Sequence, residues 1–135
     1  MPSKHFKTRI KPHIDREIRL SEEAIEKGDL ETAFRHLERA HVLGQSVTRE
    51  HTRVHWLMLR LGRLMHDRRE VLGQTLRIIG ASTKTPFGIY PTGNTGGSNV
   101  SPIKPMPVPD DLQQILNEAN GSEPGAIATR YNAKN

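Results

Sequence analysis

The chain has 135 residues, a length that suits one compact domain. It contains no cysteine, which excludes disulfide bonds and every thiolate-ligated metal site. Hydrophobic residues make up 34% and aromatic residues 4%, so we expect a modest, aliphatic core. No apolar run approaches the roughly 18 residues that cross a bilayer, and the N-terminus lacks the apolar segment of a signal peptide. We therefore expect a soluble, cytoplasmic protein with no membrane partner.

The formal net charge is +5, and its distribution decides what it implies. Residues 1–80 carry 16 Lys and Arg against 11 Asp and Glu, whereas residues 81–135 carry four of each. A nucleic-acid surface usually shows a cleaner basic stripe with aromatic residues between the charges. Here the basic residues are mixed with acidic ones, so nucleic acid is not an expected partner.

The sequence changes character near residue 80. Seven of the nine prolines lie after that position, and prolines at this density exclude long helices. We expect a helical bundle domain over residues 1–80. A Pro/Gly-rich arm with a short helix should pack on the bundle over 81–119, and residues 120–135 should form a flexible tail.

Apolar residues before residue 80 recur at helical spacing and predict four helices. Pro12 fits the first turn of the first helix, which should run to Gly28. Asp29 can act as the N-cap of the second helix, and Gly44 can occupy the C′ position after its end. The expected inward stripes are Ile14, Ile18, Ser21, Ala24 and Ile25 on the first helix and Leu30, Ala33, Phe34, Leu37, Ala40 and His41 on the second.

Thr48 is a plausible cap for the third helix, and a break at His66 and Asp67 precedes a fourth that Gly80 should end. The expected apolar faces are Val54, Met58, Leu61 and Met65 on the third helix and Val71, Leu72, Thr75, Leu76 and Ile79 on the fourth. Short connections make consecutive helices antiparallel neighbours. The expected fold is therefore all-α, a four-helix antiparallel hairpin stack with an irregular Pro/Gly-rich arm and a short terminal helix.

The arm should carry tight turns at Gly93-Asn94 and Gly96-Gly97, and the short helix should start at Pro109. The glycines do not match a phosphate-binding loop. We expect apolar side chains to anchor the arm across the bundle: Phe87, Ile89, Tyr90, Ile103 and Met106.

Two short motifs could carry chemistry, Glu38-x-x-His41 and His51-x-x-x-His55. Residues three or four apart lie on one helix face, so each pair can chelate one ion. In an antiparallel hairpin between Gly44 and Thr48, His41 should be level with His51 and Glu38 with His55. Glu17 lies at a similar height on the first helix and is a possible fifth ligand.

Helical metal centres are built from Glu and His side chains that converge inside a bundle. Neutral imidazoles and carboxylates suit a divalent transition metal, which could be zinc, nickel, cobalt, copper or iron. Affinity should then fall below about pH 6, where ordinary imidazoles become protonated. The alternative is that Glu38–His55 and Glu17–His41 are buried polar pairs without a metal. His5, His36 and His66 are assigned no role.

Two resemblances add to this interpretation. The stretch Ala24-Ile25-Glu26-Lys27-Gly28-Asp29, with Ala33, Leu37 and Ala40, resembles the helical hairpin of one tetratricopeptide repeat. The chain also resembles a small bacterial family of domains of unknown function over about residues 10–118. The stretches that carry this second resemblance are residues 37–45, 51–63, 67–74 and 93–107. Members of that family are often encoded near heavy-metal resistance genes, which favours a metal-related role by association.

The leading hypothesis is a metal-binding helical protein for metal handling or sensing in a metal-stress pathway. Its expected metal ligands are Glu38, His41, His51, His55 and Glu17. The alternative is a metal-free protein–protein interaction module with a tetratricopeptide-like groove, bound to a protein partner or to a second copy. An enzyme that uses an open metal position is a third, less favoured hypothesis.

Overall fold

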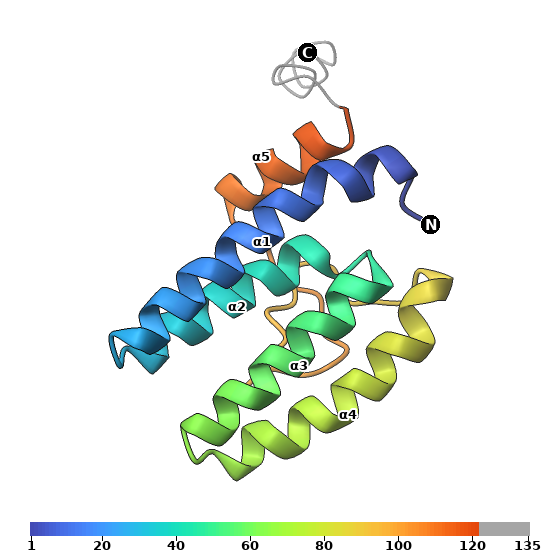
Figure 1. Ribbon diagram of the computed structural model, residues 1–135. Helices are drawn as coiled ribbons and strands as arrows, with labels where there is room; N and C mark the ends of the chain where they lie inside the picture. The colour runs from blue at the N-terminus through green and yellow to red at the C-terminus, as the bar shows by residue number, and fades with distance from the viewer. Residues whose placement is uncertain (122–135) are drawn as a thin grey trace, which may run out of the picture.

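The computed structural model describes residues 1–121, and they form an all-α fold without strands, as predicted (Figure 1). The tail expected from residue 120 lies outside the described residues from 122 onward. The helices are α1 (Lys4–Glu26), α2 (Leu30–Gly44), α3 (Thr48–Leu64), α4 (Arg68–Lys84) and α5 (Asp110–Ala119), with one 3-10 turn, η1 (Thr85–Phe87). None of the described helices is long and apolar enough to cross a membrane.

Two helical hairpins make up the bundle. Helix α1 packs along α2, α3 packs along α4, and the two hairpins meet where α2 contacts α3. Helix α5 lies against α1, where Leu112 is fully buried. The larger side chains of the shared core come from α1, α2, α3 and α5: Phe6, Ile10, Ile14, Ile18, Leu37, Leu43, Val54, Met58, Leu61 and Leu112.

Helix α1 begins earlier than predicted, and Pro12 lies inside it rather than in its first turn. The helix is capped by Ser3, whose Oγ accepts a hydrogen bond from the Phe6 amide at 3.0 Å. Phe6 and Ile10 extend the buried stripe by two turns before Ile14. Burial of these two side chains offsets the one backbone hydrogen bond that Pro12 removes.

The turn between α2 and α3 uses different residues from those predicted. Gly44 is the last residue of α2, and Val47 rather than Thr48 is the N-cap of α3, without a side-chain hydrogen bond. A Cβ at Gly44 would lie 3.2 Å from Glu50 Cβ and 3.3 Å from Ile14 Cδ1. Gly44 therefore allows the helices to approach closely rather than supplying a left-handed turn. The predicted cap Asp29 is confirmed, and Asp67, which was predicted only as part of a break between helices, is the N-cap of α4; each accepts an amide hydrogen bond at 3.0 Å.

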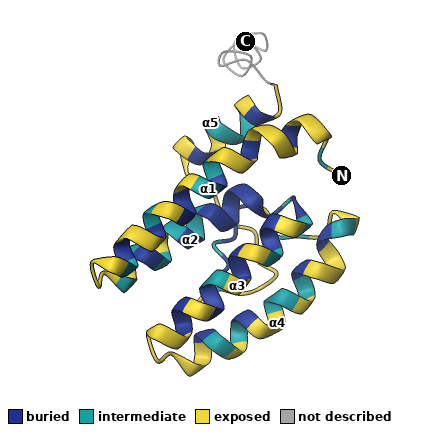
Figure 2. Ribbon diagram, viewed as in Figure 1, coloured by how far each residue is buried: buried dark blue, intermediate teal, exposed yellow. Residues whose placement is uncertain are grey.

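Helix α4 turns a different face toward the bundle from the one that its apolar spacing predicts. Leu72, Leu76 and Ile79 are 65%, 64% and 58% exposed, and the buried residues are Glu70, Gln74 and Ala81 (Figure 2). The helix also continues through Gly80 to Lys84. The polar side chains turn inward because they find hydrogen-bond partners there, which removes the usual cost of burying them.

The arm is held largely by hydrogen bonds, because only two of the five predicted apolar anchors, Tyr90 and Met106, are partly buried. Phe87, Ile89 and Ile103 are all more than 60% exposed. Gln45 at the end of α2 instead donates to the Pro91 carbonyl and accepts from the Gly93 amide, at 2.7 and 3.0 Å. These bonds hold the arm against the bundle. The arm passes behind α3 in the view of Figure 1.

Candidate metal centre

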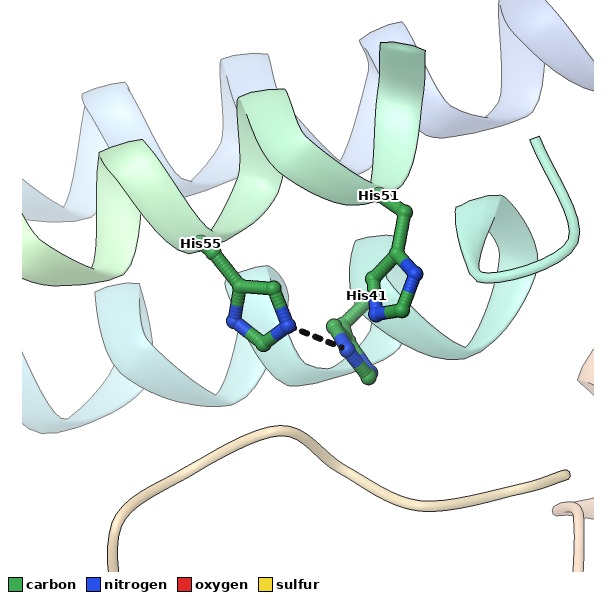
Figure 3. Close-up of side chains that lie close together, drawn as sticks. All are labelled: His41, His51 and His55. Atoms are coloured by element: carbon green, nitrogen blue, oxygen red, sulfur yellow. Dashed lines mark hydrogen bonds between the residues drawn. The ribbon is translucent and has the colours of Figure 1, made fainter. Parts of the chain in front are cut away.

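Three histidines from two helices meet inside the bundle (Figure 3). His41 lies near the end of α2, and His51 and His55 lie one turn apart on α3. Their rings pack with centroids 4.6–4.8 Å apart, and one nitrogen from each lies within 4.8 Å of the other two. The side chains are buried, with exposures of 2%, 6% and 3%. This is the only group of three or more His, Cys, Asp or Glu suited to an ion within residues 1–121.

Each imidazole uses Nδ1 to contact an oxygen outside the cluster. His41 donates to the backbone carbonyl of Asn94 at 2.7 Å, and His55 donates to the side-chain Oε1 of Gln74 at 2.6 Å. His51 Nδ1 lies 2.7 Å from the hydroxyl oxygen of Thr85. Metal-binding histidines have this arrangement in general, because the outer hydrogen bond fixes the tautomer and the ring orientation.

The orientation of the Gln74 amide is set by its other partners. Its Nε2 donates to the Glu70 carboxylate and to the Gly96 carbonyl, at 2.5 and 2.8 Å. Both partners are acceptors, so the nitrogen must face them and Oε1 must face His55. His55 therefore carries its proton on Nδ1, and so does His41, whose partner is a carbonyl.

These tautomers leave two lone pairs that face one another. Nε2 of His41 and Nε2 of His55 are 3.1 Å apart, a distance at which one would ordinarily donate to the other. A neutral imidazole that donates from Nδ1 has no proton left on Nε2. A cation that both nitrogens share, either a metal ion or a proton, would satisfy the two lone pairs.

Burial lowers the pKa of all three histidines. It brings the pKa of His51 to about 3, with help from His55 and Arg77, and the pKa of His55 to about 4. The pKa of His41 falls well below its usual value for the same reason. The imidazoles are thus neutral at pH 7, the state that binds metal, and protons compete only at lower pH than the value of 6 expected for ordinary histidines.

A glycine lets the arm approach the site. Gly96 has φ +84°, and a Cβ there would lie 2.8 Å from ring atoms of His41. Asn94 stabilises this loop, since its Oδ1 accepts from the Gly96 amide and its Nδ2 donates to the Ser101 and Lys104 carbonyls. The hydrogen-bonded turns lie at Thr92-Gly93 and Ser98-Asn99 rather than at the predicted Gly93-Asn94 and Gly96-Gly97, and the loop between them brings the Asn94 carbonyl to His41.

The structure does not bring the two predicted carboxylates into the cluster. Glu17 accepts from Arg39 Nε at 3.0 Å and contacts His36 Nδ1 at 2.7 Å, so both its oxygens are occupied. Glu38 is half-buried beside Thr95 and Glu70, and burial raises its pKa. Neither carboxylate belongs to the group of three histidines. The alternative pairs Glu17–His41 and Glu38–His55 do not form, because the histidines contact Asn94 and Gln74 instead.

Sequence reasoning missed the residues that orient the imidazoles: Gln74, Asn94, Thr85 and Glu70. One signal for them was present, since Glu70 and Gln74 are four residues apart and therefore share a helix face. The prediction placed the apolar residues of α4 on the inward face and therefore left the face of Glu70 and Gln74 outside. Thr85 and Asn94 lie in segments without helical period, so no spacing rule indicated them.

The site borders a surface cleft of about 930 Å³ between α4 and the arm. All three histidines reach it, together with apolar side chains such as Leu72, Leu76 and Ile103. This volume is in the range of small-molecule sites. A metal held here would therefore have a side accessible to a ligand.

The chain matches a family model described as a protein of unknown function (DUF3703) over residues 8–116. That match spans most of the sequence, so the chain belongs to this family. Comparison with curated proteins and with solved structures gave no match.

Proposed function

We propose that this protein binds one divalent transition metal ion through Nε2 of His41, His51 and His55. The observation that carries the proposal is the 3.1 Å contact between Nε2 of His41 and Nε2 of His55, with both Nδ1 atoms committed to acceptors. A bound cation accounts for two facing lone pairs in a buried site, and neutral buried pairs do not.

The donor set agrees with this chemistry. With zinc–nitrogen distances of about 2.0–2.1 Å, two nitrogens of a tetrahedral site lie about 3.3 Å apart, close to the separation of the His41 and His55 nitrogens. Three imidazoles suit zinc, cobalt, nickel, copper(II) or iron. Three protein ligands also leave a coordination position open, as in catalytic rather than structural zinc sites. Metal handling or sensing is the role we assign, because within residues 1–121 the cluster consists of the three histidines alone, without a carboxylate.

The test is the metal content of the untagged protein, measured by inductively coupled plasma mass spectrometry after loading and desalting. We expect about one ion per chain in the wild type and almost none in a His51→Ala/His55→Ala variant. The matched control is His5→Ala/His66→Asn, which also removes two histidines but none from the cluster. It should retain the ion.

Helical circular dichroism shows whether the double variant folds. If it does not, His55→Gln alone should fold and lose most of the affinity. Wild-type protein that takes up none of zinc, cobalt, nickel, copper or iron would refute the proposal. Equal uptake by the wild type and the folded variants would refute it as well.

A further inference from the structure

The cleft beside the histidines has a chemistry of its own. One wall comes from α4, with Leu72 and Leu76, and the other from the arm, with Ile89, Val100 and Ile103. Leu72, Leu76, Ile89 and Ile103 are all more than 60% exposed, so apolar surface stands open to solvent here. Exposed apolar surface around a concave site is typical of a place where a ligand binds.

The charged residues of the cleft are all basic. Arg69, Arg77 and Lys84 line it, and no Asp or Glu does among the described residues. Arg77 is half-buried and lies close enough to the imidazoles to lower the pKa of His51 and His55. Its guanidinium donates one N–H to the Val100 carbonyl at 2.6 Å, and a guanidinium has further N–H donors.

A divalent ion on three neutral imidazoles would add two more positive charges beside Arg77. An uncompensated charge is costly in a buried setting, and none of the three proposed ligands is an anion. An anion at the open coordination position would compensate the metal and would add to the negative charge of Glu70, which already acts on the Arg77 guanidinium. Carboxylates suit both partners, because they ligate these metals and pair with arginine in two-point geometry.

From these observations we propose that the cleft binds a small organic carboxylate with an apolar body. Its carboxylate takes the open position of the metal and pairs with Arg77, and its hydrocarbon part lies between α4 and the arm. This inference rests on the proposed metal site for one of its two contacts. The other contact, the ion pair with Arg77, is supplied by the cleft itself.

Gly80 offers a way to fill the cleft without touching the histidines. It lines the cleft within α4, and a Cβ there would meet nothing within 4 Å. A Gly80→Leu side chain therefore enters open space and improves the helix propensity. Ser82→Leu is the matched control, since Ser82 is exposed on the same helix and does not line the cleft.

The experiment titrates cobalt-loaded protein with acetate, butanoate, hexanoate and 1-hexanol, followed by cobalt absorption and by calorimetry. We expect the carboxylates to change the cobalt spectrum, with affinity rising up to about fourfold for each added methylene. Hexanol should leave the spectrum unchanged. Arg77→Met should weaken hexanoate at least tenfold, and Gly80→Leu should abolish the advantage of hexanoate over acetate while Ser82→Leu keeps it.

Hexanoate that binds no more tightly than acetate would overturn the apolar part of the proposal. Equal affinities in Gly80→Leu and Ser82→Leu would overturn the location. A protein that takes up no cobalt would refute the metal site instead, and hexanoate titration of the metal-free protein then decides the cleft separately. Binding there that Gly80→Leu removes supports the cleft, and no binding overturns it.

Discussion

Gln74 accepts the Nδ1 hydrogen of His55 at 2.6 Å, and this bond turns Nε2 of His55 toward His41. The two residues come from the facing helices α4 and α3. Gln74 is fully buried, and its amide also bonds Glu70 and Gly96. One side chain thus connects a helix, the arm and an imidazole, so a substitution at Gln74 should disturb all three.

Gln74→Leu should therefore weaken metal binding by about 10–100-fold, the usual effect of losing a partner behind a metal-bound histidine. His55 would no longer be held in one tautomer. Competition of the protein with a chromogenic chelator for zinc measures the change. Thr75→Leu is the control, because Thr75 is exposed on the same helix. Equal affinities in the two variants would contradict the positioning role of Gln74.

Gly96→Ala should both destabilise the fold and weaken the site. Its Cβ would lie 2.8 Å from the His41 ring, and its φ of +84° is unfavourable for alanine by about 1–2 kcal/mol. Gly88→Ala is a matched control, since Gly88 has φ +73° but nothing within 4 Å of its Cβ. Thermal unfolding and zinc affinity of both variants separate backbone strain from the contact with His41. We expect only Gly96→Ala to lose zinc affinity.

The stability of the metal-free protein should fall as the pH drops below about 6.5. The pKa of a histidine in the unfolded chain is near 6.5, whereas burial lowers the pKa of His55 to about 4 and the pKa of His51 to about 3 in the folded state. The unfolded chain therefore binds more protons between these values. His55 alone should lose on the order of 3 kcal/mol by pH 4. Urea unfolding in the presence of a chelator measures this loss. A His51→Gln/His55→Gln variant should show a shallower slope, and identical slopes would refute the assignment.

Glu17→Gln should lower stability and leave the metal content unchanged. Glu17 joins α1 to Arg39 of α2, and Arg39 also pairs with Asp111 of α5 at 2.6 Å. The loss of a buried charged partner commonly costs about 1–3 kcal/mol. Chemical denaturation gives the stability, and elemental analysis gives the metal. A drop in metal content without unfolding would restore Glu17 as a ligand candidate.

The helices were largely predictable from the sequence, because apolar spacing and the cap Asp29 are local signals. The inward stripe of α2 was predicted well, since Ala33, Leu37, Ala40 and His41 are all buried. The face of α4 that packs against the bundle was predicted incorrectly. Its most apolar face lies at the cleft, and its buried face is polar, so a rule that places apolar residues inward selects the wrong side.

The candidate site was predictable only in part for the same reason. His41, His51 and His55 are on helices whose register across a short turn can be counted. Glu17 and Glu38 lie level with these histidines along their helices, but Glu17 contacts Arg39 and His36, and Glu38 contacts Thr95. The position of a residue along a helix axis does not determine which partner its side chain contacts. Asn94 and Thr85 reach the site through the arm and η1, whose course depends on tertiary hydrogen bonds.

In the proposed site, three imidazoles hold one ion through their Nε2 atoms. X-ray absorption spectroscopy of the untagged, zinc-loaded protein tests it most directly. We predict three imidazole nitrogens at about 2.0 Å and one further light ligand. The His5→Ala/His66→Asn variant should give the same spectrum. A shell with fewer than three imidazoles, or a carboxylate from this chain in place of one of them, would contradict the account.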